Sequence, residues 1–255
     1  MEDRLISPKE NHRSKRHQTL SLLPYYYTMH AISAMNNEAV RVYLRRGRYT
    51  DSNSFLLKAL QGLYDMRGKE HAWAASPAAA ATTVDFSVVR ILEEEDSTAL
   101  MAASASNLFA VYPNAFAAHC HGAINELTFV EVSAALIFNA GLTYHLRGLR
   151  QPTSRQNDLK EAIRHYGSAL TLLRMNRSIC ADSVQSYLLT LALLNNLGHV
   201  FCDSGRMEES LRCAESMERL LEDDHFLGIP DVEAEFFSSG VLLTKSYSIR
   251  AAGAA

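Results

Sequence analysis

One spacing of small, aromatic and glycine residues occurs three times along the chain, and it constrains the fold more than any other feature of the sequence. In the clearest copy, Gly198 is followed by Phe201 three residues later and by Gly205 after four more. At the same intervals, the two earlier copies have Val40, Tyr43 and Gly47, and Gly141, Tyr144 and Gly148. Recurrence at a fixed spacing predicts a repeated structural unit, so the fold class follows from what one copy can form.

Each copy has the pattern of two helices joined by a turn. A small residue within the first helix lets the second helix approach closely, and a glycine ends the first helix in the left-handed conformation. In the second copy, apolar residues then recur at helical period, at Leu159, Ala162, Ile163, Tyr166, Ala169, Leu170 and Leu173. We therefore predict helical hairpins, with the first helix of the second copy ending at Gly148 and a connector over 149–161.

These residues resemble the tetratricopeptide repeat, in which a Leu-Gly pair, an aromatic residue and a turn glycine recur in this order. The best match runs over 196–205, and the resemblance covers about half of the chain, over 31–60, 132–173 and 186–221. It departs from the repeat in its long connector, in the lack of a closing proline and in the separation of the copies. The resemblance implies a mostly helical fold of antiparallel hairpins, of the α-solenoid type, with a capping helix over 233–250.

A stretch of different character separates the first two copies. Residues 82–92 are rich in β-branched side chains with partial alternation, and 107–112 are similar and are followed by Pro113. We interpret the two runs as the strands of a β-hairpin inserted at about 82–116. The block over 109–148 is also similar to a recurring block of repeat-containing algal proteins, a likeness that implies no known activity.

The composition agrees with a soluble helical protein that has a basic, disordered tail over 1–27 and one domain over 28–255. Hydrophobic residues make up 47% of the chain, and 12 glycines and 6 prolines are few for an all-β fold. A net charge of -3 argues against nucleic acid or a membrane as partner. Four separated cysteines and no apolar leader indicate reduced thiols in the cytoplasm. The basic run over 13–17 leaves nuclear import open.

The sequence contains no catalytic signature, and we predict no catalytic residue, no metal and no cofactor. The cluster His119-Cys120-His121 has the ligand types that zinc prefers. On a strand, however, the cysteine side chain would face away from both histidines. A rival hypothesis is an enzyme or regulatory subunit with its site in the irregular region 68–124, where the converging residues would be His71, Asp85, His119 and His121.

The resemblance also implies a binding groove lined by the first helix of each hairpin. Transferred by spacing from the turn glycines, its positions are Asn37, Arg41, Arg45, Phe138, Leu142, His145, Asn195, His199 and Cys202. Asparagine and arginine can bind the backbone or carboxylates of an extended peptide, and the apolar side chains add contact. The alternative is that the arginines are ordinary surface charges near a helix C-terminus.

The sequence therefore predicts a non-catalytic adaptor or scaffold that binds a protein or peptide partner in this groove. A third hypothesis stays open, in which the chain is a structural protein that assembles with itself. The apolar residues over 236–243 would then form the seam of a homo-oligomer.

Overall fold

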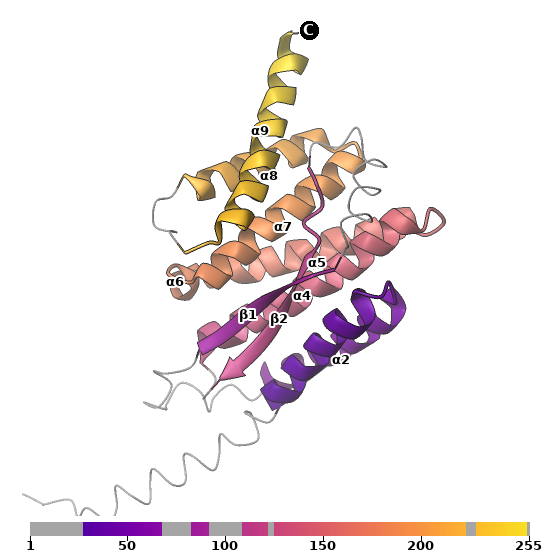
Figure 1. Cartoon of the computed structure of the whole chain (residues 1–255), viewed down its shortest axis with the longest axis vertical. Coiled ribbons are helices and arrows are strands. Elements are labelled where there is room, and N and C mark those ends of the chain that lie inside the picture. The colour runs from indigo at the N-terminus through magenta and orange to yellow at the C-terminus, as the bar shows by residue number, and fades with distance from the viewer. Residues whose placement is uncertain (1–27, 68–82, 92–108, 122–124, 223–227, 254–255) are drawn as a thin grey trace, which may run out of the picture.

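The computed structural model describes residues 28–67, 83–91, 109–121, 125–222 and 228–253 (Figure 1). Within these residues the fold is mostly helical and includes a small two-stranded antiparallel sheet, which confirms the prediction of a mostly helical protein with a β-hairpin. The predicted N-terminal tail lies outside the described residues.

The helices follow one another in packed pairs. The helix over 28–38 continues as the π-helical η1 (Ala39–Leu44) and pairs with α2 (Tyr49–Arg67). The later helices are α4 (Glu126–Arg150), α5 (Arg155–Met175), α6 (Arg177–Cys180), α7 (Val184–Asp203), α8 (Met207–Leu221) and α9 (Asp231–Gly253). Helix α4 packs on α5, α7 on α8, and α9 on α8, while α2 contacts α4 and α5 contacts α7. Each predicted hairpin is thus a pair of neighbouring helices, and the predicted terminal helix is present as α9.

Two of the three predicted turn glycines end a helix as expected. Gly47 and Gly205 have φ angles of 70° and 73°, in the left-handed region that favours glycine. The prediction for Gly148 is wrong, because α4 continues through it to Arg150 and the connector is only 151–154. A Cβ on Gly148 would lie 3.1 Å from Cβ of Asp158, so α5 approaches α4 closely at this position.

The first and third turns share further contacts at the same spacing. In the first turn, the guanidinium of Arg48 lies 4.8 Å from the centre of the Tyr43 ring and binds Asp51 at 2.7 Å. In the third turn, the guanidinium of Arg206 lies 4.5 Å from the centre of the Phe201 ring and binds Glu209 at 2.8 Å. The arginine after the turn glycine therefore joins the aromatic residue of one helix to the start of the next helix.

The small residues within the first helices make close contacts, but with different partners. A Cβ on Gly141 would lie 2.7 Å from the ring of Tyr166, which confirms that α5 approaches α4 closely at this point. A Cβ on Gly198 would lie 2.6 Å from the ring of Phe109, which belongs to the segment before the second strand and not to α8. The partner helix α8 also reaches Gly198, since Ser210 donates to the Gly198 carbonyl at 2.9 Å, so two elements approach this glycine.

The sheet consists of β1 (Thr83–Arg90) and β2 (Asn114–His121), with Asp85 opposite His119 and Val88 opposite Phe116. The first strand lies where the sequence predicts it. The prediction of a second strand over 107–112 is wrong, because pairing with β1 begins only after Pro113. Ala110 and Tyr112 bond instead to α7, as described below.

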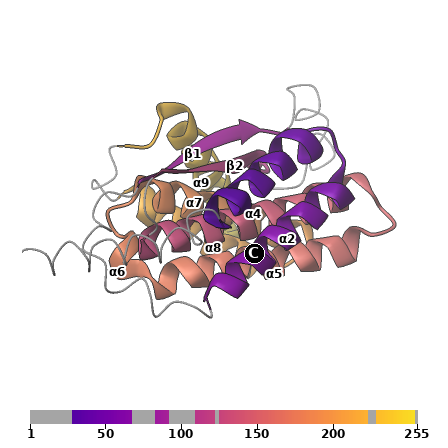
Figure 2. The ribbon, with the colours of Figure 1, turned by 90° about the horizontal axis from the view of Figure 1, so that it is seen from below.

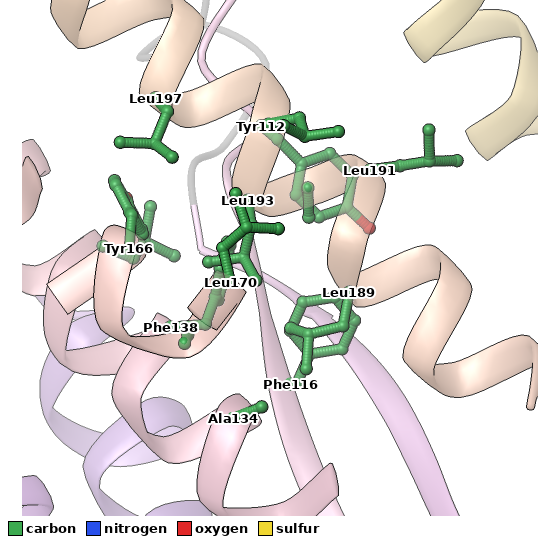
Figure 3. Packing of buried hydrophobic residues seen from close by; sticks show 14 of the residues in the cluster. Tyr112, Phe116, Ala134, Phe138, Tyr166, Leu170, Leu189, Leu191, Leu193 and Leu197 are labelled. Carbon is green, nitrogen blue, oxygen red and sulfur yellow. The ribbon is translucent and has the colours of Figure 1, made fainter. Parts of the chain in front are cut away.

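The sheet covers one face of the helices, and β2 packs against α4 (Figure 2). Side chains from β2, α4, α5 and α7 meet in the main core (Figure 3). Phe116 and Phe138 pack edge to face there, with ring centres 5.1 Å apart. Among the described helices, α4 alone is long and apolar enough to span a membrane, but 83% of its apolar window is buried inside the fold. Such burial is typical of a central helix in a helical core.

Candidate interaction groove

The helix over 28–38, α4 and α7 provide the face on which the sequence predicts a peptide groove; we call it the inner face. A segment of the same chain lies on it. This segment, residues 109–121, consists of β2 and the five residues before it, and we call it the resident segment. Asparagine side chains from all three helices bind its backbone.

Asn139 of α4 makes the central contact. Its side-chain oxygen accepts the backbone N–H of Phe116 at 3.0 Å, and its Nδ2 donates to the carbonyl of Phe116 at 2.8 Å. The same Nδ2 also donates to Oδ1 of Asn36. Nδ2 of Asn36 in turn donates to the Phe116 carbonyl at 2.8 Å. Both asparagines are fully buried, so every one of these bonds forms away from water.

The two outer helices make equivalent contacts. Asn37 binds both backbone groups of Ala118 at 2.9 Å. On α7, Asn196 accepts the N–H of Tyr112 at 2.8 Å and donates to its carbonyl at 3.2 Å. In addition, Asn195 of α7 donates to the carbonyl of Ala110 at 2.8 Å.

The contacted residues, 110, 112, 116 and 118, are separated by multiples of two. Backbone groups of an extended chain point alternately to its two edges, so all four residues present theirs to the helices. A side-chain amide has one acceptor and one donor, which match the N–H and C=O of a single strand residue. The asparagines therefore take the place of a neighbouring strand and satisfy buried backbone groups that β1 does not reach.

Aromatic side chains anchor the resident segment to the core. Phe109, Tyr112 and Phe116 are each 2% exposed or less. Phe109 lies against Gly198, and the ring of Tyr112 lies 5.0 Å from that of Phe237 in α9. The resident segment is thus part of the hydrophobic core as well as the occupant of the inner face.

The structure brings four of the predicted groove residues into contact with the resident segment, one of them being Arg41 through the side chain of His119. Asn37 and Asn195 bind its backbone, and Phe138 packs on the ring of Phe116. Leu142 is fully buried in the core. The asparagines that sequence reasoning missed are Asn36, Asn139 and Asn196. Their signal was the presence of amides within otherwise apolar helical runs, where an unpaired polar side chain would be costly.

His145 and His199, also predicted for the groove, form a buried pair between α4 and α7. Nε2 of His145 lies 3.0 Å from Nδ1 of His199, and Nδ1 of His145 lies 3.3 Å from the hydroxyl of Tyr166. That hydroxyl also accepts from Asn196 at 3.3 Å, so the pair is linked to the resident segment. Burial, and then the neighbouring imidazole, lower the pKa of His145 well below its usual value. Burial lowers the pKa of His199 to about 4.

The predicted arginines lie at the edge of the inner face. Arg41 donates to the hydroxyl of Ser87 at 3.1 Å and lies 3.3 Å from Nε2 of His119. Arg45 is exposed, one turn further along the same chain. Cys202 is half-buried near the end of α7. Arg41 therefore contacts the outside of the hairpin, and Arg45 contacts solvent.

The residues of the rival enzyme hypothesis are brought together only in part. His71 lies outside the described residues. Asp85 and His119 are direct cross-strand neighbours, whereas His121 is opposite Thr83. Within the described part of the chain, no three side chains of histidine, cysteine, aspartate or glutamate are grouped as metal ligands would be.

A separate cavity of about 380 Å³ lies between the resident segment, α7 and α9. Its lining includes Ala110, Asn195, Val232, Phe236, Gly240 and Leu243. Within the range 236–243 that the sequence proposes as a seam, Phe237 and Val241 are buried, whereas Leu242 and Leu243 are 67% and 57% exposed.

The inner face binds an extended chain through its backbone. All four cysteines are free thiols, and burial raises the pKa of Cys120, Cys180 and Cys213. Comparison with protein-family models, curated proteins and solved structures found no significant match to this chain.

Proposed function

We propose that this chain is a non-catalytic scaffold of the tetratricopeptide-like class that binds a protein partner in the cytoplasm. The succession of helix pairs and the turn contacts repeated at Arg48 and Arg206 support the repeat assignment. We also propose that these helix pairs are arranged as an α-solenoid.

One observation carries the proposal: the inner face binds an extended chain by its backbone, through asparagines from three successive helix pairs. Such contacts do not depend on the side chains of the bound segment. A face of this kind is suited to holding a strand and has no chemical group that would transform it.

The burial of the resident segment favours a partner that binds with the segment in place. Its three aromatic anchors would each expose roughly 150–250 Å² on leaving the core. The hairpin keeps exposed side chains on β1, at Asp85, Val88 and Arg90, and so remains accessible to a partner. We therefore propose that the resident segment completes the fold and that the partner docks on the outside of the hairpin and the neighbouring turns.

The test is to lock β2 onto the helix over 28–38 and to ask whether partners still bind. Oγ of Ser33 lies 3.1 Å from Sγ of Cys120, so Ser33→Cys places two sulfur atoms within reach of a disulfide. The tagged protein is purified from its own cells, and co-purified proteins are identified by mass spectrometry. Wild type, the oxidised variant and the reduced variant are compared, with Ser33→Cys in a Cys120→Ser background as the control that cannot cross-link.

We expect the same partners with wild type and with the oxidised variant. Loss of partners on oxidation, reversed by reductant, would keep the scaffold function but move the partner into the inner face. If no protein is enriched over an untagged control in any of the preparations, the scaffold proposal is wrong.

A further inference from the structure

The three helix-pair turns lie at the same end of the helices, on the right of Figure 1. Ion pairs join arginines to carboxylates at the second and third turns. At the second turn, Arg147 binds Asp158 at 2.5 Å. Between the second and third turns, Arg155 binds Asp203 at 2.6 Å. Arg206 of the third turn has its own carboxylate, as described above. Each of these arginines is therefore matched by an acidic side chain.

The first turn has more arginines than carboxylates. Arg48 binds Asp51, whereas Arg45 and Arg46 are exposed and have no acidic partner among the described residues. The guanidinium of Arg150, at the end of α4, lies beside this turn, because a Cβ on Gly47 would be 3.4 Å from its NH1 atom. Several guanidinium groups thus surround one short turn.

Comparison with the third turn shows that the excess charge is not required by the turn itself. Arg45 and Asp203 both lie two residues before the turn glycine. Asp203 receives the arginine of the preceding helix pair, but the first turn has a positive charge at the corresponding place. A helix C-terminus favours a cation by only about 0.3–1 kcal/mol, and α7 ends in the same kind of turn with an aspartate. The arginines at 45 and 46 therefore need an explanation other than helix stability.

We propose that Arg45, Arg46 and Arg48, which we call the arginine edge, form the docking surface for an acidic segment of a protein partner. This inference rests on the scaffold function and specifies where and how the partner binds. Planar guanidinium groups bind carboxylates in a bidentate manner, and the fold already uses one arginine–carboxylate pair within a helix pair and one between successive helix pairs. The partner would supply the carboxylates that the first turn lacks.

The surroundings of the edge favour a polypeptide over a nucleic acid. The two aromatic rings at the turn, Tyr43 and Tyr49, already lie under the guanidinium groups of Arg48 and Arg150, at 4.8 Å and 5.9 Å. They are not free to stack with bases, which is how single-stranded nucleic acids gain much of their affinity.

The test measures binding of a fluorescein-labelled 12-residue peptide of alternating glutamate and serine to the full chain, by fluorescence anisotropy at low and physiological salt. The variant is Arg45→Glu with Arg46→Glu. The matched control is Arg174→Glu with Arg177→Glu, two exposed arginines beyond the edge, which changes the net charge by the same amount. A lysine–serine peptide and a 12-nucleotide oligouridylate serve as further probes, and circular dichroism verifies that both variants are folded.

We expect the glutamate peptide to bind wild type and the control pair with similar affinity, and the edge variant to bind at least tenfold more weakly. An equal loss of peptide affinity in the edge variant and the control pair would show a general charge effect. Tighter binding of the oligonucleotide than of the glutamate peptide would assign the edge to nucleic acid. Either result overturns the inference. The co-purification experiment distinguishes a failure of the arginine edge from a failure of the scaffold function. Partners that co-purify equally with wild type and the edge variant would retain the scaffold and refute the edge, whereas a chain without partners would refute the scaffold.

Discussion

Asn139 and Phe116 are joined by two hydrogen bonds, one to each backbone group of Phe116, across 23 residues of sequence. The amide of Asn139 thereby acts as a single residue of a neighbouring strand. Because the site is fully buried, no water can replace the amide if it is removed.

Asn139→Ala is expected to lower the free energy of unfolding by about 2–3 kcal/mol, because it leaves the Phe116 N–H buried without an acceptor. The Phe116 carbonyl keeps its bond from Asn36. Urea denaturation provides the measurement. The control Asn157→Ala, at an exposed position of α5, should change stability by no more than about 0.5 kcal/mol. Equal effects of the two substitutions would contradict the role assigned to Asn139.

Two glycines within helices should respond in opposite ways to the same substitution. Gly198→Ala would place a methyl group 2.6 Å from the Phe109 ring and should destabilise the protein by about 1–3 kcal/mol. The methyl group of Gly167→Ala would have no atom within 4 Å. This substitution should stabilise α5 by up to about 1 kcal/mol, since alanine is the better helix former. Thermal unfolding followed by circular dichroism gives both values. A stabilising Gly198→Ala would mean that Phe109 is not held against α7.

Two buried tyrosines differ in what their hydroxyls contact. The hydroxyl of Tyr112 makes no hydrogen bond of good geometry, although Asn114 and Glu233 lie near it, whereas that of Tyr166 contacts Asn196 and His145. Tyr112→Phe should therefore leave stability unchanged or raise it by up to about 1 kcal/mol, and Tyr166→Phe should lower it by about 1–2 kcal/mol. Both variants keep the ring packing, so chemical denaturation compares the hydroxyls alone. The reverse order of stabilities would refute this assignment.

The buried histidine pair predicts a loss of stability in acid. Burial lowers the pKa of His199 to about 4 in the folded chain, below the ordinary value of 6.5. As the pH falls from 6.5 towards 4, the unfolded chain takes up a proton that the folded chain does not, so the free energy of unfolding decreases. The decrease from His199 amounts to about 3 kcal/mol by pH 4. Above pH 6.5 both states are neutral, and this histidine has no effect on the pH dependence.

The measurement is the slope of unfolding free energy against pH between 4 and 6.5, from urea titrations at each pH. His199→Gln should reduce the slope even if it lowers stability throughout. A variant with the slope of wild type would show that the folded chain accommodates the proton at His199.

The sequence was sufficient to predict the helix pairs, because their determinants are local. The turn glycines at 47 and 205 require a left-handed conformation, and the apolar stripe over 159–173 requires a helix. The prediction failed at Gly148, because a glycine that ends a helix and one that admits a neighbouring helix look the same in a sequence. Only the contact with Asp158 distinguishes them.

The second strand could not be placed from its own residues. Ala115, Ala117 and Ala118 have low strand propensity, so the alternating run before Pro113 was the stronger signal. What holds residues 114–121 extended is β1 and the amides of Asn36, Asn37 and Asn139. These amides come from helices that precede and follow β2 in the chain.

The groove positions were predicted by spacing, and Asn37 and Asn195 do lie on the inner face. The occupant of that face was not predictable, since no local pattern indicates that residues 109–121 lie against three helices. Asn139 was missed because its neighbours are apolar, and the only indication of its role is the cost of burying an amide without a partner.

The resident segment also has a consequence for how the chain folds. Arrays of helix pairs with contacts only between neighbours unfold piece by piece. Here one segment bonds to the first, second and third pairs, with sequence separations of 81, 23 and 84 residues. It can reach its final position only when all three pairs are in register, so its docking is expected to be the late, slow step. Opening of any one pair would release the segment from the others, and the array should therefore melt as a single cooperative unit.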